Sequence, residues 1–341
     1  MTHLLEETNS LNEEQIAAIN TGSGTFKVLA GPGSGKTAVL VARHNRLKQQ
    51  GHNPLCLTFT KAAANEMKQR SGGGNFRTIH SQAYKILKDN ADYAEGGFIA
   101  PPLDELIPQA TEILVRHPYI FRFLLVDEAQ DCSNTDWDFI SRLSHNIFAV
   151  GDAMQCLYGF RNSKPDLFLH MENMFHDTKT LYLGQNYRST QRIVEFCKSV
   201  APIRGALLEK ICTHNEIGDP VTHIGFQHNV EEAEYVIDCV RRLEQDGDKD
   251  SVVLARTNKQ LEVFLKLHAP EHLELRTIHA AKGAEWDNVF VVGTQQGLIP
   301  FKDGDVDEES RILFVAASRA KKRLTLTRYG TPSRFLLAPG R

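Results

Sequence analysis

Two segments of this sequence carry residue types that can hold and cleave a chain of phosphates. Residues 30–37 read Ala-Gly-Pro-Gly-Ser-Gly-Lys-Thr, between an apolar run at 26–29 and a stretch of helical character at 38–48. A strand, a glycine-rich loop ending in Lys and Thr, and then a helix form the context of a phosphate-binding P-loop. Further along, residues 124–131 read Leu-Leu-Val-Asp-Glu-Ala-Gln-Asp, an apolar run that ends in carboxylates.

The loop at 30–37 suits phosphate oxygens. Its glycines let backbone N–H groups crowd around the phosphates, and the helix that follows adds the positive end of its dipole. Lys36 would reach the β- and γ-phosphates, and the Thr37 hydroxyl would ligate Mg²⁺. The competing explanation is a glycine-rich turn without a ligand. The residues predicted to bind nucleotide here are Gly31, Gly33, Ser34, Gly35, Lys36 and Thr37.

The two acids Asp127 and Glu128 follow an apolar run at 121–126 that is typical of a strand in the middle of a parallel sheet. Such sheets bind ligands at the carboxyl ends of their strands. By itself the pair is explained as well by an acidic helix start. With the P-loop upstream, we interpret Asp127 as a ligand of Mg²⁺ and Glu128 as the group that positions or deprotonates the attacking water.

Composition sets limits on the class of protein. The chain has 341 residues with 41% apolar content, enough for two domains with separate cores. The formal net charge of −3 gives no global positive field. Near the end, residues 303–309 are acidic whereas 311–341 carry only basic charges, which indicates either a solvated face or a strip facing phosphates.

The six cysteines are scattered, without CxxC or Cys/His ligand spacing, and predict reduced thiols. No signal peptide and no apolar run of membrane-spanning length is recognisable. We therefore expect a soluble, intracellular (cytoplasmic) protein without a membrane partner.

Strands and helices alternate along the chain, which predicts an α/β fold with mainly parallel sheets. We expect a boundary within 174–179, giving domains at 1–177 and 178–341. The predicted strands are 26–29, 55–60, 123–126, 147–150, 180–183, 221–224, 252–255, 273–277 and 289–292. The predicted helices are 38–48, 61–70, 79–88, 190–200, 230–245, 259–268 and 308–317.

Read in order, further segments resemble the motifs of superfamily 1 DNA helicases of the UvrD/Rep/PcrA type. The resemblance covers almost the full length, and the order of the motifs makes it specific. Beyond the P-loop and the acidic pair, the matching segments are 11–15 (the Q motif), 58–67 (Ia), 78–81, 151–161 (III), 185–189 (IV), 277–286 (V) and 308–320 (VI).

The resemblance implies two RecA-like P-loop domains with one ATP in the cleft between them. Arg188 and Arg319 of the second domain would contact the γ-phosphate, as arginine fingers do. Gln155 would couple the state of the nucleotide to DNA. By the same resemblance, Gln15 and Tyr187 would contact adenine and Glu285 the ribose.

For single-stranded DNA, the resemblance points to aromatic side chains that stack on bases and polar ones that bind phosphates. Each aromatic alone is as well explained as a core residue. Phe160 stands where the family commonly has Trp. The predicted DNA-contacting residues are Phe59, Thr60, His80, Phe160, Thr277, His279 and Trp286.

The sequence also departs from the family. Residues 89–121 leave only a remnant of the insertion in the first domain, and the segment 258–277 leaves none in the second. The hairpin expected before Pro332-Ser-Arg-Phe335 is short or missing. We therefore expect strong ATPase stimulated by single strands and 3′→5′ translocation, with weak unwinding unless a protein partner supplies a wedge.

Two other classes remain open. One is a P-loop switch or regulatory module that signals by shape, against which Glu128 and the two arginines argue. The other is a degenerate subunit of a nuclease, against which the intact Lys36, Asp127, Glu128 and Arg319 argue.

Overall fold

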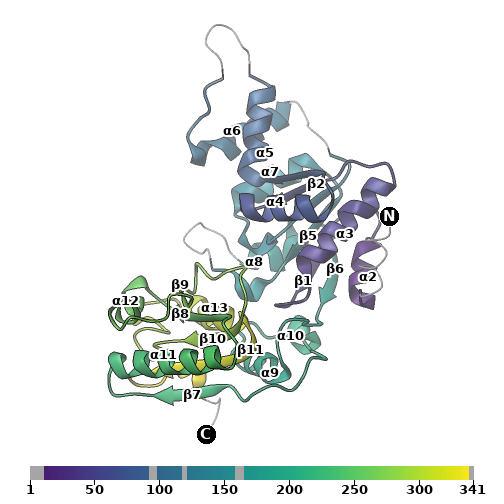
Figure 1. Cartoon of the computed structure of the whole chain (residues 1–341). Helices are drawn as coiled ribbons and strands as arrows, with labels where there is room; N and C mark the ends of the chain where they lie inside the picture. Colours follow the sequence, from purple (N-terminus) through teal and green to yellow (C-terminus); the bar gives the residue numbers. More distant parts are fainter. Residues whose placement is uncertain (1–10, 92–97, 117–120, 158–164, 338–341) are drawn as a thin grey trace. The chain divides into compact units, whose positions relative to one another are not determined.

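The computed structural model describes residues 11–91, 98–116, 121–157 and 165–337 (Figure 1). Contacts between residues divide the chain into two compact units. The first comprises residues 1–30 and 35–183, and the second comprises residues 31–34 and 184–341. The tip of the glycine-rich loop thus groups with the second unit, whereas Lys36 and Thr37 belong to the first. Each unit is an α/β structure around one parallel sheet.

The sheet of the first unit has six strands in the order β3-β2-β4-β5-β1-β6, all parallel. Its four inner strands are almost wholly buried, as their apolar composition predicts. The strands are β1 (Phe26–Ala30), β2 (Leu55–Thr58), β3 (Asn75–Thr78), β4 (Leu124–Val126), β5 (Ile147–Gly151) and β6 (Lys179–Leu183). Because every strand is parallel, the loops at their carboxyl ends share one edge.

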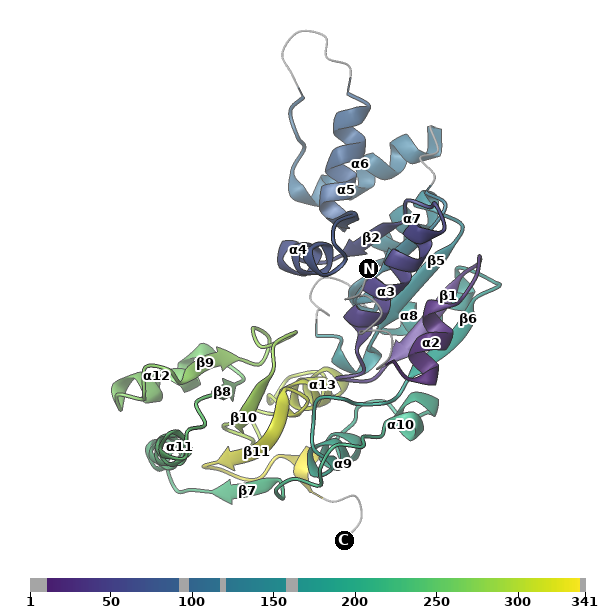
Figure 2. The same ribbon diagram turned by 45° about the vertical axis from the view of Figure 1, so that its right-hand side comes forward.

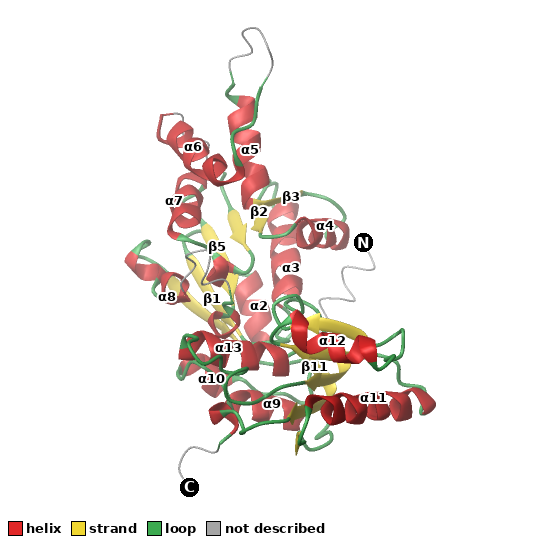
Figure 3. Cartoon of the chain, turned by 90° about the vertical axis from the view of Figure 1, so that its left-hand side faces the viewer, coloured by secondary structure: helices red, strands yellow, loops and turns green. Residues whose placement is uncertain are grey.

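Helices cover both faces of this sheet, with α3 on one side and α7 and α8 on the other (Figure 3). One core cluster joins α2, α3 and α4 to the sheet through side chains such as Val39, Leu40 and Met67. The helices are α2 (Glu13–Ile19), α3 (Lys36–Gln49), α4 (Lys61–Arg70), α5 (Ile79–Asp89), α6 (Leu103–Arg116), α7 (Asn134–Leu143) and α8 (Pro165–Leu169). Short 3₁₀ turns η1 (Ala129–Asp131), η2 (Ala153–Gln155) and η4 (Met171–Asn173) follow β4, β5 and α8.

The second unit has five parallel strands in the order β7-β11-β10-β8-β9. Helices α11 and α12 cover one face, and α9 and α13 the other (Figure 2). The strands are β7 (Thr222–Gly225), β8 (Ser251–Ala255), β9 (Glu274–Thr277), β10 (Trp286–Val291) and β11 (Ala320–Arg328). The helices are α9 (Gln191–Ser199), α10 (Ala206–Lys210), α11 (Asn229–Gln245), α12 (Asn258–Lys266), α13 (Val306–Ala317) and the 3₁₀ turn η5 (Arg334–Leu336).

The α/β fold with parallel sheets is confirmed, and the predicted helices and strands are found within a few residues of their expected bounds. The strands β3 and β11 and the helices α2, α7, α8 and α10 were not predicted. The boundary at 177/178 is also misplaced, because β6 pairs with β1 along its length and so completes the first sheet. The units meet along the chain at Leu183 and Gly184.

Few elements are described in the two segments where we expected a reduced insertion and no insertion. Between α5 and β4 the structure describes one helix, α6, which packs on α5. Between β8 and β9 it describes only α12. All six cysteines are free thiols. Among the residues that the structure describes, no helix is long and apolar enough to cross a membrane.

Gly151 ends β5 at a point of close approach. A Cβ built there would lie 2.5 Å from Gln130 Oε1 and 2.9 Å from the Phe168 ring. We predict that Gly151→Ala lowers the free energy of unfolding by about 1–3 kcal/mol, because the added carbon overpacks this junction. Urea denaturation measures the change. Gly22→Ala is the matched control, since nothing lies within 4 Å of its Cβ position; equal losses in the two variants would contradict the prediction.

Candidate nucleotide site and nucleic-acid interface

The glycine-rich loop joins the buried strand β1 to helix α3. Gly33 and Gly35 have positive φ angles of 66° and 79°, which glycine adopts at no steric cost. The Ser34 hydroxyl donates to the Gly31 carbonyl at 2.8 Å and closes the turn. Helix α3 has no side-chain cap at its N-terminus and no acid in its first turn. This end of α3 therefore offers backbone N–H groups and the positive end of a helix dipole to an anion.

Gln15 lies against the same loop. A Cβ at Gly35 would come within 2.8 Å of Gln15 Nε2, so the predicted adenine-reading amide does neighbour the P-loop. Its Oε1 accepts the backbone N–H of Asn12 at 3.0 Å and completes a capping box at the start of α2. The side chain is buried, with 4% exposed.

Asp127 and Glu128 stand at the carboxyl end of β4. Asp127 is 5% exposed, and its backbone N–H still pairs with Leu57 of β2. Burial raises the pKa of Asp127 to about 7, with the Glu128 charge adding to the rise and Lys36 opposing it. Burial also raises the pKa of Asp152, at the end of the neighbouring β5, against the opposing effect of Lys36. Lys36 thus faces two buried carboxyl groups at one edge of the sheet.

These groups fit a magnesium nucleotide. Among the described residues no cluster of three or more His, Cys, Asp or Glu could hold a metal ion alone. Thr37 and Asp127 would supply two oxygens, which suits Mg²⁺, an ion usually held by one or two protein groups together with phosphates and water.

Side-chain amides organise the turns after β4 and β5. Gln130, fully buried, donates to Glu128 Oε2 at 2.7 Å and accepts from the backbone N–H of Asp152 at 2.9 Å. Gln155 Nε2 donates to Asp152 Oδ2 at 2.7 Å. The predicted residue Gln155 is therefore linked through Asp152 to the acidic pair. Neither Gln130 nor Asp152 was among the predicted site residues.

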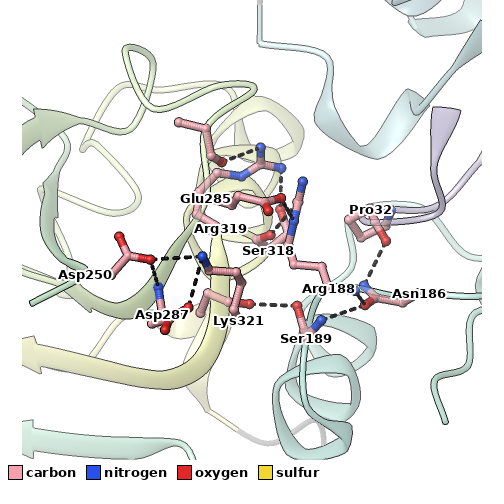
Figure 4. A network of polar contacts seen from close by, with 12 residues as sticks. Pro32, Asn186, Arg188, Ser189, Asp250, Glu285, Asp287, Ser318, Arg319 and Lys321 are labelled. Atoms are coloured by element: carbon pink, nitrogen blue, oxygen red, sulfur yellow. Dashed lines mark hydrogen bonds and ion pairs between the residues drawn. The ribbon is translucent and has the colours of Figure 1, made fainter. Parts of the chain in front are cut away.

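In the second unit, Arg188 forms an ion pair within its own fold (Figure 4). Its Nε donates to Glu285 Oε2 at 2.5 Å, and its Nη1 donates to the Ser318 carbonyl at 2.9 Å. The structure thus brings together two residues that were predicted to contact different parts of one nucleotide.

Arg319 lies in the same cluster but is buried, with 2% exposed. Its guanidinium donates to the carbonyls of Val315 and Ala284 at 3.1 and 3.2 Å, and to the Ser318 hydroxyl at 2.9 Å. A buried guanidinium requires such acceptors. In this structure the two predicted arginine fingers are therefore satisfied by atoms of their own unit.

Asn186 holds the segment before Arg188. Its amide donates to the Pro32 carbonyl at 2.8 Å and accepts from the backbone N–H groups of Arg188 and Ser189, both at 2.8 Å (Figure 4). Tyr187 donates its backbone N–H to the Gly33 carbonyl at 2.9 Å and leaves its side chain 46% exposed. An exposed aromatic ring beside the tip of the loop fits the predicted adenine contact.

The predicted DNA-contacting residues of the first unit follow two neighbouring strands. Phe59 and Thr60 come after β2 and His80 after β3, and these strands pair with Thr58 opposite Thr78. The side chains of Thr60 and Thr78 cap α4 and α5. Two helix N-termini therefore lie beside the expected phosphate contacts, at the same sheet edge as Asp127 but on the other side of β4 from β5 and β1.

In the second unit, Thr277 is the last residue of β9, which pairs with β8, and His279 follows this strand. Burial lowers the pKa of His279, and the charge on Arg256 lowers it further. His279 is therefore neutral at neutral pH and offers a phosphate an N–H donor rather than a charge. Phe160 lies outside the residues that the structure describes.

The predicted stacking function of Trp286 is not supported. The residue begins β10 and is 4% exposed, and Arg276 lies over its ring at 5.4 Å from the centroid. It packs in the core because β10 pairs on both sides, with β8 and β11.

The basic run near the end of the sequence faces acids. Lys321 Nζ lies 2.9 Å from both Asp250 and Asp287, as Figure 4 shows. Arg323 lies 3.1 Å from Asp219 and from Asp248. Because these cations pair with acids of the same chain, a solvated face explains this part of the basic run better than a strip that faces phosphates.

A P-loop at the start of one helix, a buried Asp-Glu pair on the same sheet edge and a second parallel sheet with paired arginines define a P-loop nucleoside triphosphatase of two α/β units. Comparison with known families gives a narrower assignment. The AAA domain family matches residues 13–161. The UvrD-like helicase C-terminal domain matches residues 181–267 and 262–331. The chain belongs to the UvrD/PcrA-type helicases.

Individual relatives are distant. A probable DNA helicase of Mycoplasma pneumoniae is 25% identical, over 96% of this chain and 86% of that protein. The ATP-dependent DNA helicase PcrA of Leuconostoc citreum is 26% identical, over 74% of this chain and 48% of its own length. PcrA of Staphylococcus epidermidis is 26% identical, over 76% of this chain and 50% of its own length. The chain thus spans about half the length of the PcrA relatives that it matches.

Because the pKa of Asp127 is raised, we predict that replacing this residue by Asn stabilises the fold but lowers ATP turnover. A carboxyl whose pKa rises from 3.8 unfolded to about 7 folded stabilises the fold at low pH, and this contribution is lost as pH rises through 7. Asp127→Asn should therefore raise the free energy of unfolding at pH 8 by at least about 1 kcal/mol, and by much less at pH 5. It should also lower magnesium-dependent ATP turnover more than about 100-fold.

Thermal unfolding without nucleotide at both pH values tests the stability change, and steady-state ATP turnover tests the activity. Asp138→Asn is the control, because Asp138 is exposed and pairs only with Arg142 on the same helix. A change in the free energy of unfolding for Asp127→Asn that is the same at both pH values would refute a raised pKa of Asp127 as its cause.

Proposed function

We propose that this protein is an ATP-dependent translocase on single-stranded DNA that moves 3′→5′, and a helicase whose unwinding is weak without a partner. One observation carries the proposal. The Lys36 loop and the Asp127–Glu128 pair lie at one edge of a single parallel sheet, and at this edge Phe59 follows strand β2 and His80 follows strand β3, in the first turn of α5. A nucleotide site and a row of residues suited to single strands thus belong to one rigid sheet.

The chemistry assigned to the first unit is hydrolysis of the γ-phosphate. Backbone N–H groups of the loop and Lys36 bind the phosphates, and Thr37 and Asp127 hold Mg²⁺, which neutralises charge on the phosphate oxygens. Glu128 orients the attacking water and accepts its proton.

The second unit would supply Arg188 and Arg319 to the γ-phosphate. Support for this comes from the family assignment and from the position of both side chains in one polar cluster. Arg188, with 15% of its side chain exposed, is paired with Glu285, whose side chain is 45% exposed. Because the partner is half exposed, a phosphate can replace it at modest cost.

Movement along DNA would use the strand ends of both units. Stacking on Phe59 and hydrogen bonds from Thr60, His80, Thr277 and His279 form contacts that do not depend on base sequence. The structure describes no hairpin between β11 and η5 and only α12 between β8 and β9, so the described residues include no evident wedge. A protein partner that contributes one would complete an unwinding enzyme.

The assignment of Arg188 is testable by substitution. We predict that Arg188→Ala lowers DNA-stimulated ATP turnover about 10³-fold or more, because an arginine finger stabilises charge in the transition state. Arg192→Ala is the control, since Arg192 lies on α9 and forms an exposed pair with Glu195 at 3.6 Å. Turnover by Arg188→Ala within about threefold of the wild type would rule out this function for Arg188.

The motor activity calls for a stopped-flow assay on end-labelled single strands, with a forked duplex measured alongside. We expect ATP turnover that rises with single strands, depends on Lys36 and falls steeply with salt, because phosphate contacts release counterions. We expect a change in the signal of the 5′ label when the moving protein reaches that end of the strand. We also expect the two strands of the forked duplex to separate slowly. Rapid unwinding of a blunt-flanked duplex by the isolated chain would contradict the limit on unwinding.

The alternative is a nucleotide-dependent P-loop switch or regulatory module without motor activity. It would bind ATP through the same loop but would need no DNA contacts. ATP turnover that is unchanged by oligonucleotides would favour this alternative over the translocase.

A further inference from the structure

A continuous path of hydrogen bonds leads from the proposed catalytic base, Glu128, to the turn after β5. The Gln130 amide donates to the Glu128 carboxylate at 2.7 Å and accepts the Asp152 backbone N–H at 2.9 Å. The Asp152 carboxylate accepts the Gln155 amide at 2.7 Å and the Met154 backbone N–H at 3.0 Å. Gln130 is the one residue on this path that bridges the two strand ends.

The Gln130 amide can take only one orientation. The backbone N–H of Asp152 is a donor, so the amide atom facing it must be the oxygen, and the NH₂ group must then face Glu128. The main chain is also tethered, because Cys156 Sγ donates to the Gln130 carbonyl at 3.3 Å. With the side chain fully buried, no water competes for these bonds.

The backbone of Glu128 requires such support. Its φ and ψ are 50° and 42°, in the left-handed region, which costs a residue with a side chain roughly 1–2 kcal/mol. Strained conformations of this kind persist where the surroundings fix them, and they concentrate at functional sites. The turn that this conformation creates brings Gln130 back over Glu128, and Gly151 leaves room for the amide because it lacks a Cβ.

We propose that Gln130 is a positioning residue for hydrolysis. It fixes the Glu128 carboxylate for the attacking water, and it links that carboxylate to Asp152 and Gln155, so that a displacement of the turn after β5 reaches the acid. The inference rests on the proposed ATPase. Gln130 does not contact substrate, and its effect is on the orientation of Glu128.

In a chain of hydrogen bonds between buried groups, a displacement of one group moves the next. Asp152 is fully buried, so its contacts have no solvent to replace them. Misplacing a catalytic group by about 1 Å can cost 100-fold in rate. Loss of the link should therefore lower kcat while the binding of ATP, which depends on the glycine-rich loop and Lys36, stays nearly constant.

Two substitutions separate positioning from folding. Gln130→Met keeps length and volume but removes the side-chain hydrogen bonds to Glu128, to Asp152 and, at 3.5 Å, to Asp131. Gln130→Glu keeps an acceptor for the Asp152 N–H and replaces the donor facing Glu128 with a carboxyl group. The titratable groups around this position are Glu128 and Asp131 on the same turn, Asp152 and Cys156 after β5, and Asp127 with Lys36.

We expect Gln130→Met to lower kcat for ATP about 10- to 100-fold, with KM changed less than about threefold. We expect Gln130→Glu to show a similar loss at pH 8 that shrinks severalfold, relative to the wild type, at pH 6. At the lower pH the introduced carboxyl becomes protonated, and its O–H can donate to Glu128. Gln130→Met lacks such a group and should show the same loss at both pH values.

Gln109→Met is the matched control, because Gln109 also donates to a glutamate, Glu105 at 2.8 Å, but on the exposed face of α6. Wild type and Lys36→Ala are measured in the same series, with binding of a fluorescent ATP analogue. Lys36-dependent turnover that is unchanged in Gln130→Met would overturn the inference and leave the proposed function standing. A loss in Gln130→Glu that does not shrink at pH 6 would also overturn it. Absence of Lys36-dependent turnover in the wild type would overturn both.

Discussion

Parallel pairing of β1, β5 and β4 is the constraint on which the rest of the nucleotide site depends. Leu29 lies opposite Gly151, and Val126 opposite Ala149, so the three strands end within three residues of each other. That alignment places the loop before Lys36 beside two acids on neighbouring strands. The hydrophobic strands that hold the acids also desolvate them, and this desolvation raises the pKa values of Asp127 and Asp152. Lys36 is the positive charge that partly offsets it.

In the second unit, the two arginines that we propose to contact the γ-phosphate are held by acceptors of that same unit. Arg188 uses the half-exposed carboxylate of Glu285, and Arg319 uses backbone carbonyls and a hydroxyl. Both guanidinium groups are therefore hydrogen-bonded within this unit.

The sequence predicted the elements whose pattern is local and missed those that depend on distant partners. The inner strands are apolar throughout, and most helices were found near their predicted ends. Strand β3 is short and has three polar residues out of four. In β11, Ala320 is followed by Lys321-Lys-Arg323, whose charges become acceptable in a strand because Asp219, Asp248, Asp250 and Asp287 face them. The motifs indicated Lys36 and Asp127 directly. Gln130 has no local signature, because its orientation is fixed by Asp152 after another strand.

In the proposed magnesium site, the carboxyl group of Asp127 would make nucleotide binding a proton-linked event. A magnesium ion would bind the ionised form, and with a pKa of about 7 roughly half of the sites near neutrality would have to give up a proton first. That proton passes to the buffer, so the heat recorded by titration calorimetry contains the ionisation enthalpy of whichever buffer is present. The slope of measured heat against that enthalpy counts the protons released per nucleotide bound.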